Sequence, residues 1–301
     1  MATILDQIRD SLYMGAYQSV INRATSPEVS RSKTTNQVEV KILMIRAYLT
    51  QKKFNSALNE INSLDQNDDL TRIIKNLAGY LQAKENGKTE LLNGFLEDNT
   101  SILNENQNII ANQIAVMLIA LVHLHQESYE EAMKLVALHP TDIECFALMV
   151  QAYLMVNRTD MAEQLIKMNK KTFEDSSIYQ LAESWLNLGI DKSTAEKAFY
   201  SFEELNMSTG TQTNKLLNSQ GVAKIHSGQF PEAEELFNEA LDKDNSNADT
   251  LANSAISSLI NGKGNYARIV GQIEDQNPNH SFLTDIKQKG LEFDEISKRY
   301  A

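Results

Sequence analysis

The chain has 301 residues, of which 42% are hydrophobic and 23% charged, a balance that excludes disorder for most of its length. Its formal net charge of -12 makes direct binding to nucleic acid or to anionic lipid unfavourable. The 12 Gly and 4 Pro are too few for the many turns of an all-β protein, so the composition favours helices.

The N-terminal residues carry no signal for export or lipidation. Asp6 lies where a signal peptide needs basic and then apolar residues, and Ala2 occupies the position at which myristoylation requires Gly. We therefore expect a cytoplasmic protein.

The first third of the chain predicts paired helices joined by short turns. The segment 13–20 contains Gly followed two residues later by an aromatic residue, with Val20 in the position that Ala occupies in other hairpins. Phe54 and Ala57 form a similar corner, an aromatic and a small residue three positions apart. Residues 70–84 and 88–97 predict a degenerate hairpin, followed by a polar loop at 98–108. We expect this loop and the loop at 26–35 to be flexible points within one domain.

The middle of the chain contains an unusually apolar segment. Residues 106–126 include no Asp, Glu, Lys or Arg, and residues 114–122 are wholly apolar. A membrane span needs roughly 20 predominantly apolar residues, and polar residues interrupt this segment at both ends. The pattern predicts a helix that is buried on two sides.

Small residues recur from here at a nearly constant interval. Ala132, Ala162, Ala198, Ala233 and Ala267 are separated by 30, 36, 35 and 34 residues, close to the 34-residue tetratricopeptide period. The order Gly221, Phe230, Ala233 is that of a tetratricopeptide hairpin, in which small residues mark the closest helix contacts. After Pro278, apolar residues at helical spacing predict a closing helix.

These repeats predict an all-α fold. We expect an α-solenoid of tetratricopeptide-like helical hairpins with a C-terminal capping helix, forming a single domain over residues 1–301. Each hairpin can bury its apolar face only against its neighbours, so no interior linker is expected.

The sequence offers no constellation for catalysis or metal binding. His123 and His125 are two residues apart and do not share a helix face. Cys145 lies in an apolar helical run without an assigned base, as a buried packing residue does. Gly-x-Ser-x-Gly, Walker and dinucleotide-binding motifs are absent. We expect no catalytic, cofactor-binding or metal-binding residues, and a protein that is not an enzyme.

In tetratricopeptide arrays the first helix of each hairpin lines the concave wall, and here the outward positions are unusually apolar. The repeat register gives the candidate partner-binding residues Ile114, Met117, Leu121, Leu124, Gln151, Leu154, Asn218, Val222, Ile225, Ile256 and Leu259. Two interpretations remain open: the residues grip an apolar segment of a partner protein, or neighbouring repeats cover them. A clamp for a peptide carboxylate is disfavoured, because Ile42, Arg46, Met117 and Leu121 occupy the comparable wall positions.

Several segments are similar to the epsilon-subunit family of coatomer. The resemblance is carried by residues 12–22, 46–54, 181–185, 198–205 and 239–244, and by the ending around Phe293 and Tyr300. It spans nearly the whole chain. It implies a component of an early secretory vesicle coat that binds the C-terminal domain of the alpha subunit of coatomer and stabilises it. The other coatomer subunits would be indirect partners, and no catalytic residues carry over.

The resemblance further implies Golgi-to-ER and intra-Golgi transport, with peripheral attachment to Golgi membranes and coated vesicles through the whole complex. The alternative is a generic tetratricopeptide adaptor or co-chaperone that binds a peptide in its groove. An enzyme with a site assembled from scattered residues is a third hypothesis.

Overall fold

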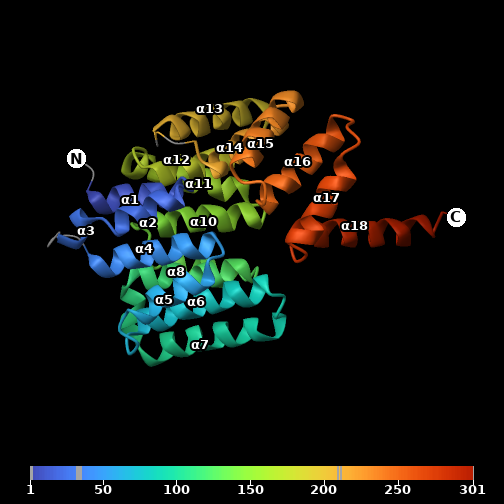
Figure 1. Ribbon diagram of the computed structural model, residues 1–301. Coiled ribbons are helices and arrows are strands. Elements are labelled where there is room, and N and C mark those ends of the chain that lie inside the picture. The colour runs from blue at the N-terminus through green and yellow to red at the C-terminus, as the bar shows by residue number, and fades with distance from the viewer. Residues whose placement is uncertain (1–2, 32–35, 209, 211, 301) are drawn as a thin grey trace. The chain divides into compact units, whose positions relative to one another are not determined.

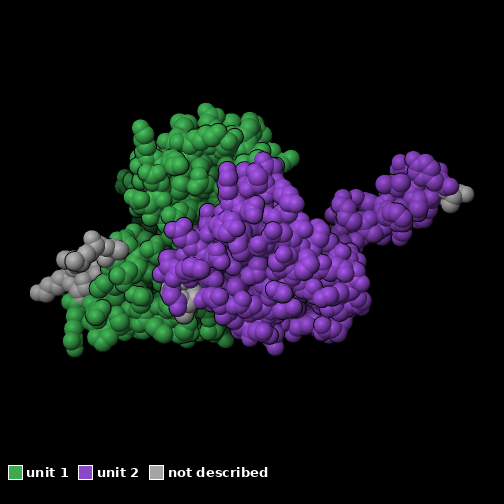
Figure 2. Space-filling model, turned by 90° about the horizontal axis from the view of Figure 1, so that it is seen from above, with its two compact units in different colours: residues 1–190 green, residues 191–301 purple. Residues whose placement is uncertain are grey.

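The computed structural model describes residues 3–31, 36–208, 210 and 212–300. In these ranges the chain forms eighteen α-helices and two short 3-10 helices, and it contains no strand (Figure 1). The prediction of an all-α fold is confirmed. The chain divides into two compact units, residues 1–190 and 191–301 (Figure 2). A single domain over the whole chain stays a prediction.

Unit 1 consists of helical hairpins followed by one further helix. Its hairpins pair α1 with α2, α4 with α5, α6 with α7, α8 with α9, and α10 with α11. The helices are α1 (Ile4–Tyr13), α2 (Tyr17–Ala24), α3 (Pro27–Arg31), α4 (Gln37–Thr50), α5 (Phe54–Asn62), α6 (Asp69–Glu85), α7 (Leu92–Glu105), α8 (Gln113–His125), α9 (Tyr129–Val136), α10 (Ile143–Met155), α11 (Thr159–Phe173) and α12 (Ser177–Leu188). The 3-10 helices are η1 (Thr89–Leu91) and η2 (Gln107–Ala111).

Unit 2 contains two hairpins between a leading helix and a closing helix. Its helices are α13 (Lys192–Ser208), α14 (Asn214–His226), α15 (Phe230–Lys243), α16 (Ala248–Ile260), α17 (Tyr266–Gln276) and α18 (Ser281–Ser297). Helix α14 packs on α13 and α15, and α16 packs on α15 and α17. The predicted closing helix is therefore present as α18.

Each hairpin turn contains one residue in the left-handed backbone region. The amide that follows this residue donates to a carbonyl five positions back, as from Ser128 N to His123 O at 2.9 Å and from Gln229 N to Lys224 O at 2.8 Å. This is the Schellman motif, which satisfies the last carbonyls of a helix and reverses the chain. The left-handed residues are Gly15, Lys52, Gly87, Glu127, Asn157, Gly228 and Gly262.

The type of residue at the left-handed turn position is expected to affect the free energy of unfolding. Glu127 has φ 62°, a region that costs an L-residue about 1 kcal/mol because its Cβ approaches the following carbonyl. We expect Glu127→Gly to raise the free energy of unfolding by up to about 1 kcal/mol, measured by urea denaturation. Gly228, at φ 75°, predicts the opposite sign for Gly228→Ala. Glu127→Ala keeps the Cβ but removes the charge, and a gain as large as that of Glu127→Gly would contradict this explanation.

The corner residues lie five positions after the left-handed residue. Those that follow this rule are buried and pack the two helices together: Val20, Ala57, Leu92, Ala132, Ala162 and Ala233. The predicted corner at Ala267 is wrong, because this residue is exposed. The turn between Gly262 and α17 is two residues longer than the turns of hairpins such as α4–α5 and α8–α9. Ile269, which is 4% exposed, therefore takes the buried position instead.

The third hairpin is longer than predicted. Residues 98–105, expected in a polar loop, continue helix α7, and η2 follows at Gln107–Ala111. Asn99 is fully buried in α7, where its Oδ1 accepts a 2.9 Å hydrogen bond from Asn76 Nδ2. This pairing lets a polar residue lie between two helices. The other predicted flexible stretch, 26–35, includes helix α3, and its residues 32–35 lie outside the described part of the chain.

Helix α8 is the centre of the largest apolar core of unit 1. Its residues 115–120 are all buried, as predicted for a helix covered on two sides. Asn112 begins the helix, with its side chain accepting from the amides of Ile114 and Ala115. Among the described residues, no helix has both the length and the apolar character that a membrane crossing requires.

Candidate partner-binding surface

The predicted residues on α8 belong to the packed interior of unit 1. Ile114, Leu121 and Leu124 are half-buried and pack against the largest core. Met117 is 2% exposed, so it lies inside that core. The interpretation that neighbouring repeats cover these positions therefore applies to α8.

On α10 the two predicted residues differ in exposure. Leu154 is half-buried against a second core that contains Phe146 and Tyr179. Gln151 is exposed and polar. Unit 1 therefore presents little apolar surface at the predicted positions.

In unit 2 the predicted residues lie on the first helices of the two hairpins, α14 and α16. We call them the α14–α16 face: Asn218, Val222, Ile225, Ile256 and Leu259. Val222 and Ile256 are 34 residues apart, as are Ile225 and Leu259, so each pair holds the same repeat position.

The apolar members of this face remain accessible. Leu259 is 61% exposed and Ile256 is 36% exposed, while Val222 and Ile225 are half-buried. Asn218 joins the two helices, because its Oδ1 accepts a hydrogen bond of 3.1 Å from Asn253 Nδ2. The arrangement fits an apolar anchor with a polar edge, as protein interfaces have.

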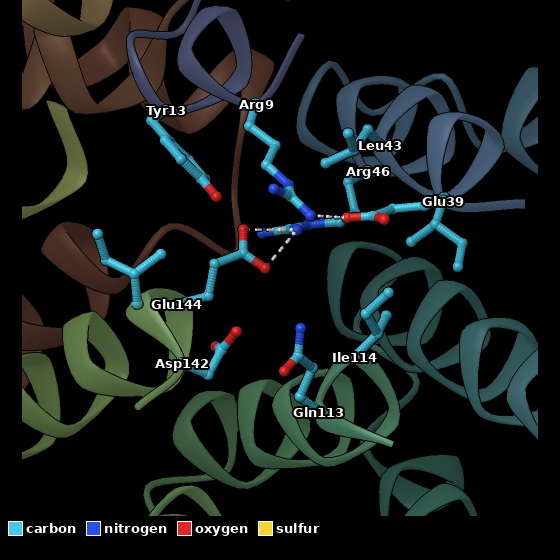
Figure 3. Close-up of a pocket in the computed structure, with 11 residues that line it drawn as sticks. Arg9, Tyr13, Glu39, Leu43, Arg46, Gln113, Ile114, Asp142 and Glu144 are labelled. Carbon is cyan, nitrogen blue, oxygen red and sulfur yellow. Dashed lines mark hydrogen bonds and ion pairs between the residues drawn. The ribbon is translucent and has the colours of Figure 1, made fainter. Parts of the chain in front are cut away.

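Unit 1 contains a polar cluster that the sequence did not reveal as a unit. Figure 3 shows Arg9 from α1, Glu39 and Arg46 from α4, and Glu144 from α10 gathered between the first helices of the hairpins. One nitrogen of Arg46 donates to both carboxylate oxygens of Glu144, at 2.8 and 3.0 Å. Arg9 forms an ion pair with Glu39. The cluster thus joins α4 to α10 through two residues, Arg46 and Glu144, that are 98 positions apart in the chain.

Burial governs the electrostatics of this cluster. Desolvation lowers the pKa of Arg46, but the carboxylate of Glu144 outweighs it, and the net pKa is raised. Burial, and then the negative charge of Glu144, raise the pKa of the Tyr13 phenol well above its ordinary value. The Tyr13 hydroxyl points toward this cluster (Figure 3) and stays protonated at neutral pH. The cluster is therefore charged but internally neutralised.

The cavity beside this cluster is small. It measures about 90 Å³ and is also lined by Gln113, Ile114 and Asp142, whereas small-molecule sites begin at roughly 300 Å³. Both arginines are already paired with glutamates, so neither is available to bind the carboxylate of a peptide. The arrangement supports a structural role.

Cys145 and the possible metal ligands are the remaining candidate reactive groups. Cys145 is 1% exposed, and burial raises the pKa of its thiol, so it stays protonated and unreactive. In the part of the chain that the structure describes, no three His, Cys, Asp or Glu residues converge as metal ligands would.

The sequence analysis predicted a close helix contact at Gly221 but missed the equivalent contact at Gly79, which a closer reading of spacing can find. Gly79 on α6 lies against Phe95 on α7, and Gly221 on α14 lies against Phe237 on α15. Each pair is 16 residues apart in the sequence, so the degenerate third hairpin shares the contact of the best-defined one. The partner of Arg46, by contrast, has no such signal, because a distance of 98 residues follows no repeat interval.

Repeated helical hairpins with buried residues at each corner define the class of the protein, an α-solenoid of the tetratricopeptide type. A solved tetratricopeptide repeat protein from Parabacteroides merdae is similar in fold, with a TM-score of 0.58 at 13% sequence identity over 90% of this chain and 96% of that chain. The family model described as coatomer epsilon subunit matches residues 1–301. The chain belongs to the coatomer epsilon-subunit family and is a component of the coatomer vesicle coat.

Two relatives illustrate the extent of the similarity. Coatomer subunit epsilon-1 of Arabidopsis thaliana is 32% identical over 279 residues, covering 92% of this chain and 90% of the relative. Coatomer subunit epsilon of Caenorhabditis elegans is 27% identical and covers 99% of this chain and 98% of the relative. The resemblance inferred from the sequence segments is thereby confirmed over the whole chain.

Proposed function

We propose that this chain is a non-catalytic scaffold subunit that binds and stabilises the C-terminal domain of the alpha subunit within the coatomer coat. The observation that carries the proposal is the accessible apolar surface of the α14–α16 face, centred on Leu259 at 61% exposed. Accessible apolar residues at two successive repeat positions, half-buried on α14 and exposed on α16, are typical of protein interfaces. The coat would act in Golgi-to-ER and intra-Golgi transport.

Membrane attachment would come from the assembled coat. The net charge of -12 opposes direct contact with anionic lipid headgroups. We therefore propose a cytoplasmic protein that reaches Golgi membranes and coated vesicles peripherally, through its partner subunits. The other coatomer subunits would be indirect partners.

Leu259→Asp tests the surface directly. We expect the variant to bind the C-terminal domain of the alpha subunit at least about tenfold more weakly, because binding would bury an unpaired carboxylate. The measurement is calorimetric titration of the purified proteins, after confirming that the wild-type chain forms a stoichiometric complex on co-expression. Leu259 is a better target than Leu121, whose half-buried side chain packs against the core of unit 1.

Met168→Asp serves as the matched control. Met168 lies on α11, the second helix of a hairpin in unit 1, and is 72% exposed, so it offers a similarly accessible apolar side chain that is not part of the α14–α16 face. Equal loss of binding in both variants would reject this face as the contact surface. Failure of the wild-type chain to form a complex would reject the alpha subunit as partner and would favour the peptide-binding adaptor.

A further inference from the structure

The C-terminal helix α18 is anchored at its start and exposed along the rest of its length. Leu283 is 2% exposed and packs into the core formed by α16 and α17, with Phe282 beside it. From residue 284 to residue 300, every residue except Glu292 is exposed. Figure 2 shows the end of this unit as an arm that stands away from the unit's body. An isolated helix of this length is only marginally stable in water. Burial of its exposed apolar residues against a partner would therefore stabilise it.

The exposed apolar residues of this arm form one stripe. Ile286, Phe293, Ile296 and Tyr300 are 37%, 71%, 51% and 88% exposed, and their spacings of seven, three and four residues are those of a heptad seam. At 100° per residue, Ile286, Phe293 and Ile296 fall within an arc of about 80° on α18, and Tyr300 follows in the turn after the helix ends at Ser297. Leu291, 67% exposed, lies on a different side of the helix.

The heptad places Ile286, Phe293 and Tyr300 at a positions, and Phe282, Lys289 and Ile296 at d positions. In a parallel pair of copies Lys289 would face Lys289, which is repulsive. In an antiparallel pair each a position faces a d position. Ile286 then faces Ile296 of the second copy, and Lys289, whose ammonium pairs with Glu292 of its own chain at 2.7 Å, faces Phe293 instead of a second lysine.

Charges beside the stripe select the same orientation. Asp285, on α18, and Arg299, in the turn that follows Ser297, occupy flanking g positions at opposite ends of the arm. In the antiparallel register Asp285 of one copy lies beside Arg299 of the other, and two-fold symmetry repeats the pair. In a parallel pair Asp285 would instead face the uncharged Gly290. The third g position, Glu292, would lie beside Glu292 of the other copy, but Lys289 of its own chain pairs with it at 2.7 Å and offsets its charge. The two Asp285–Arg299 pairs therefore still favour an antiparallel partner.

We propose that α18 is a self-association element, through which two copies of this chain pair by antiparallel contact of their α18 stripes. The seam extends over about two heptads, so the contact is small, and pairing is weak and concentration-dependent. The occupant is a second copy because the charge pattern of α18 complements itself. This inference is independent of the alpha subunit.

Sedimentation velocity of the purified full-length chain, from micromolar concentration upward, tests the pairing. We expect the wild type to shift from monomer to dimer as its concentration rises. Phe293→Asp is expected to remain monomeric throughout. Leu291→Asp, with the same charge change at a similarly exposed residue outside the stripe, is expected to dimerise like the wild type. Circular dichroism of each variant checks that its helical content is retained.

Charge reversal tests the orientation. Asp285→Arg and Arg299→Asp are each expected to weaken dimerisation several-fold, and the double variant is expected to restore it, since the opposed charges are exchanged. Monomeric wild type at every concentration, or normal dimerisation of Phe293→Asp, would overturn the proposal. If the wild type were monomeric and Phe293→Asp also lost binding to the alpha subunit, the stripe would be assigned to that partner and the proposal would be overturned. Because the sedimentation experiment contains no alpha subunit, its failure is distinct from failure of the proposed function.

Discussion

Replacing Arg46 with Met is expected to lower the free energy of unfolding by about 3 to 5 kcal/mol, as found for breaking buried ion pairs. The side chains of Arg46 and Glu144 are 19% and 16% exposed, so the variant would leave a largely buried carboxylate without its main partner. The variant also loses both hydrogen bonds that join α4 to α10. Urea denaturation followed by far-ultraviolet circular dichroism measures the loss.

Two further variants isolate the cause. Replacing both members, Arg46→Met with Glu144→Leu, removes the unpaired charge, so most of the lost stability is expected to return. Arg158→Met breaks an ion pair with Asp160 whose side chains are 56% and 64% exposed. That change is expected to cost less than about 1 kcal/mol, because water screens exposed pairs. If Arg46→Met and Arg158→Met lowered the free energy of unfolding equally, burial of the Arg46–Glu144 pair could not be the cause of the large loss.

Gly221→Ala is expected to lower the free energy of unfolding by about 3 kcal/mol, at the upper end of the usual range for overpacking. A Cβ on Gly221 would overlap the ring of Phe237, which is fully buried and cannot move aside. The intrinsic preference of helices for Ala over Gly is worth about 1 kcal/mol in the opposite direction, so the clash dominates. Thermal and urea unfolding of the purified variant give the value.

Gly94→Ala provides the control for helix propensity. Gly94 also lies within a helix, α7, but a Cβ there would meet nothing within 4 Å. We therefore expect Gly94→Ala to raise the free energy of unfolding by up to about 1 kcal/mol. Adding Phe237→Leu to Gly221→Ala should recover part of the loss, since the smaller side chain leaves room for the methyl group. Stabilisation by Gly221→Ala alone would contradict a close contact between α14 and α15.

The hairpins were predictable wherever local chemistry repeats. Ala57, Ala132 and Ala233 mark corners that the structure confirms as buried. The prediction failed at Ala267 because two additional residues before α17 shift the helix start, and a spacing rule cannot detect where a turn ends. It also failed for residues 98–105, because polar residues in that segment suggested a loop although hydrogen bonds between helices accommodate them.

The candidate site could be located by register but not by accessibility. Met117 and Leu259 hold wall positions on the first helices of their hairpins, yet one is 2% exposed and the other 61% exposed. Their neighbours in space differ, because α8 packs against α6 and α10 as well as α9. The number of helices that cover a wall position depends on the angle between successive hairpins. The sequence of one hairpin does not specify that angle.

The sequence by itself determined the helical hairpins, their nearly constant period and the family to which the chain belongs. Those properties follow from residues a few positions apart, whose turn geometry and packing are local. Only the tertiary structure decided which apolar wall residues remain accessible and that Arg46 meets Glu144 across 98 residues. Such contacts arise from small rotations added up over many hairpins, so no short stretch of sequence encodes them.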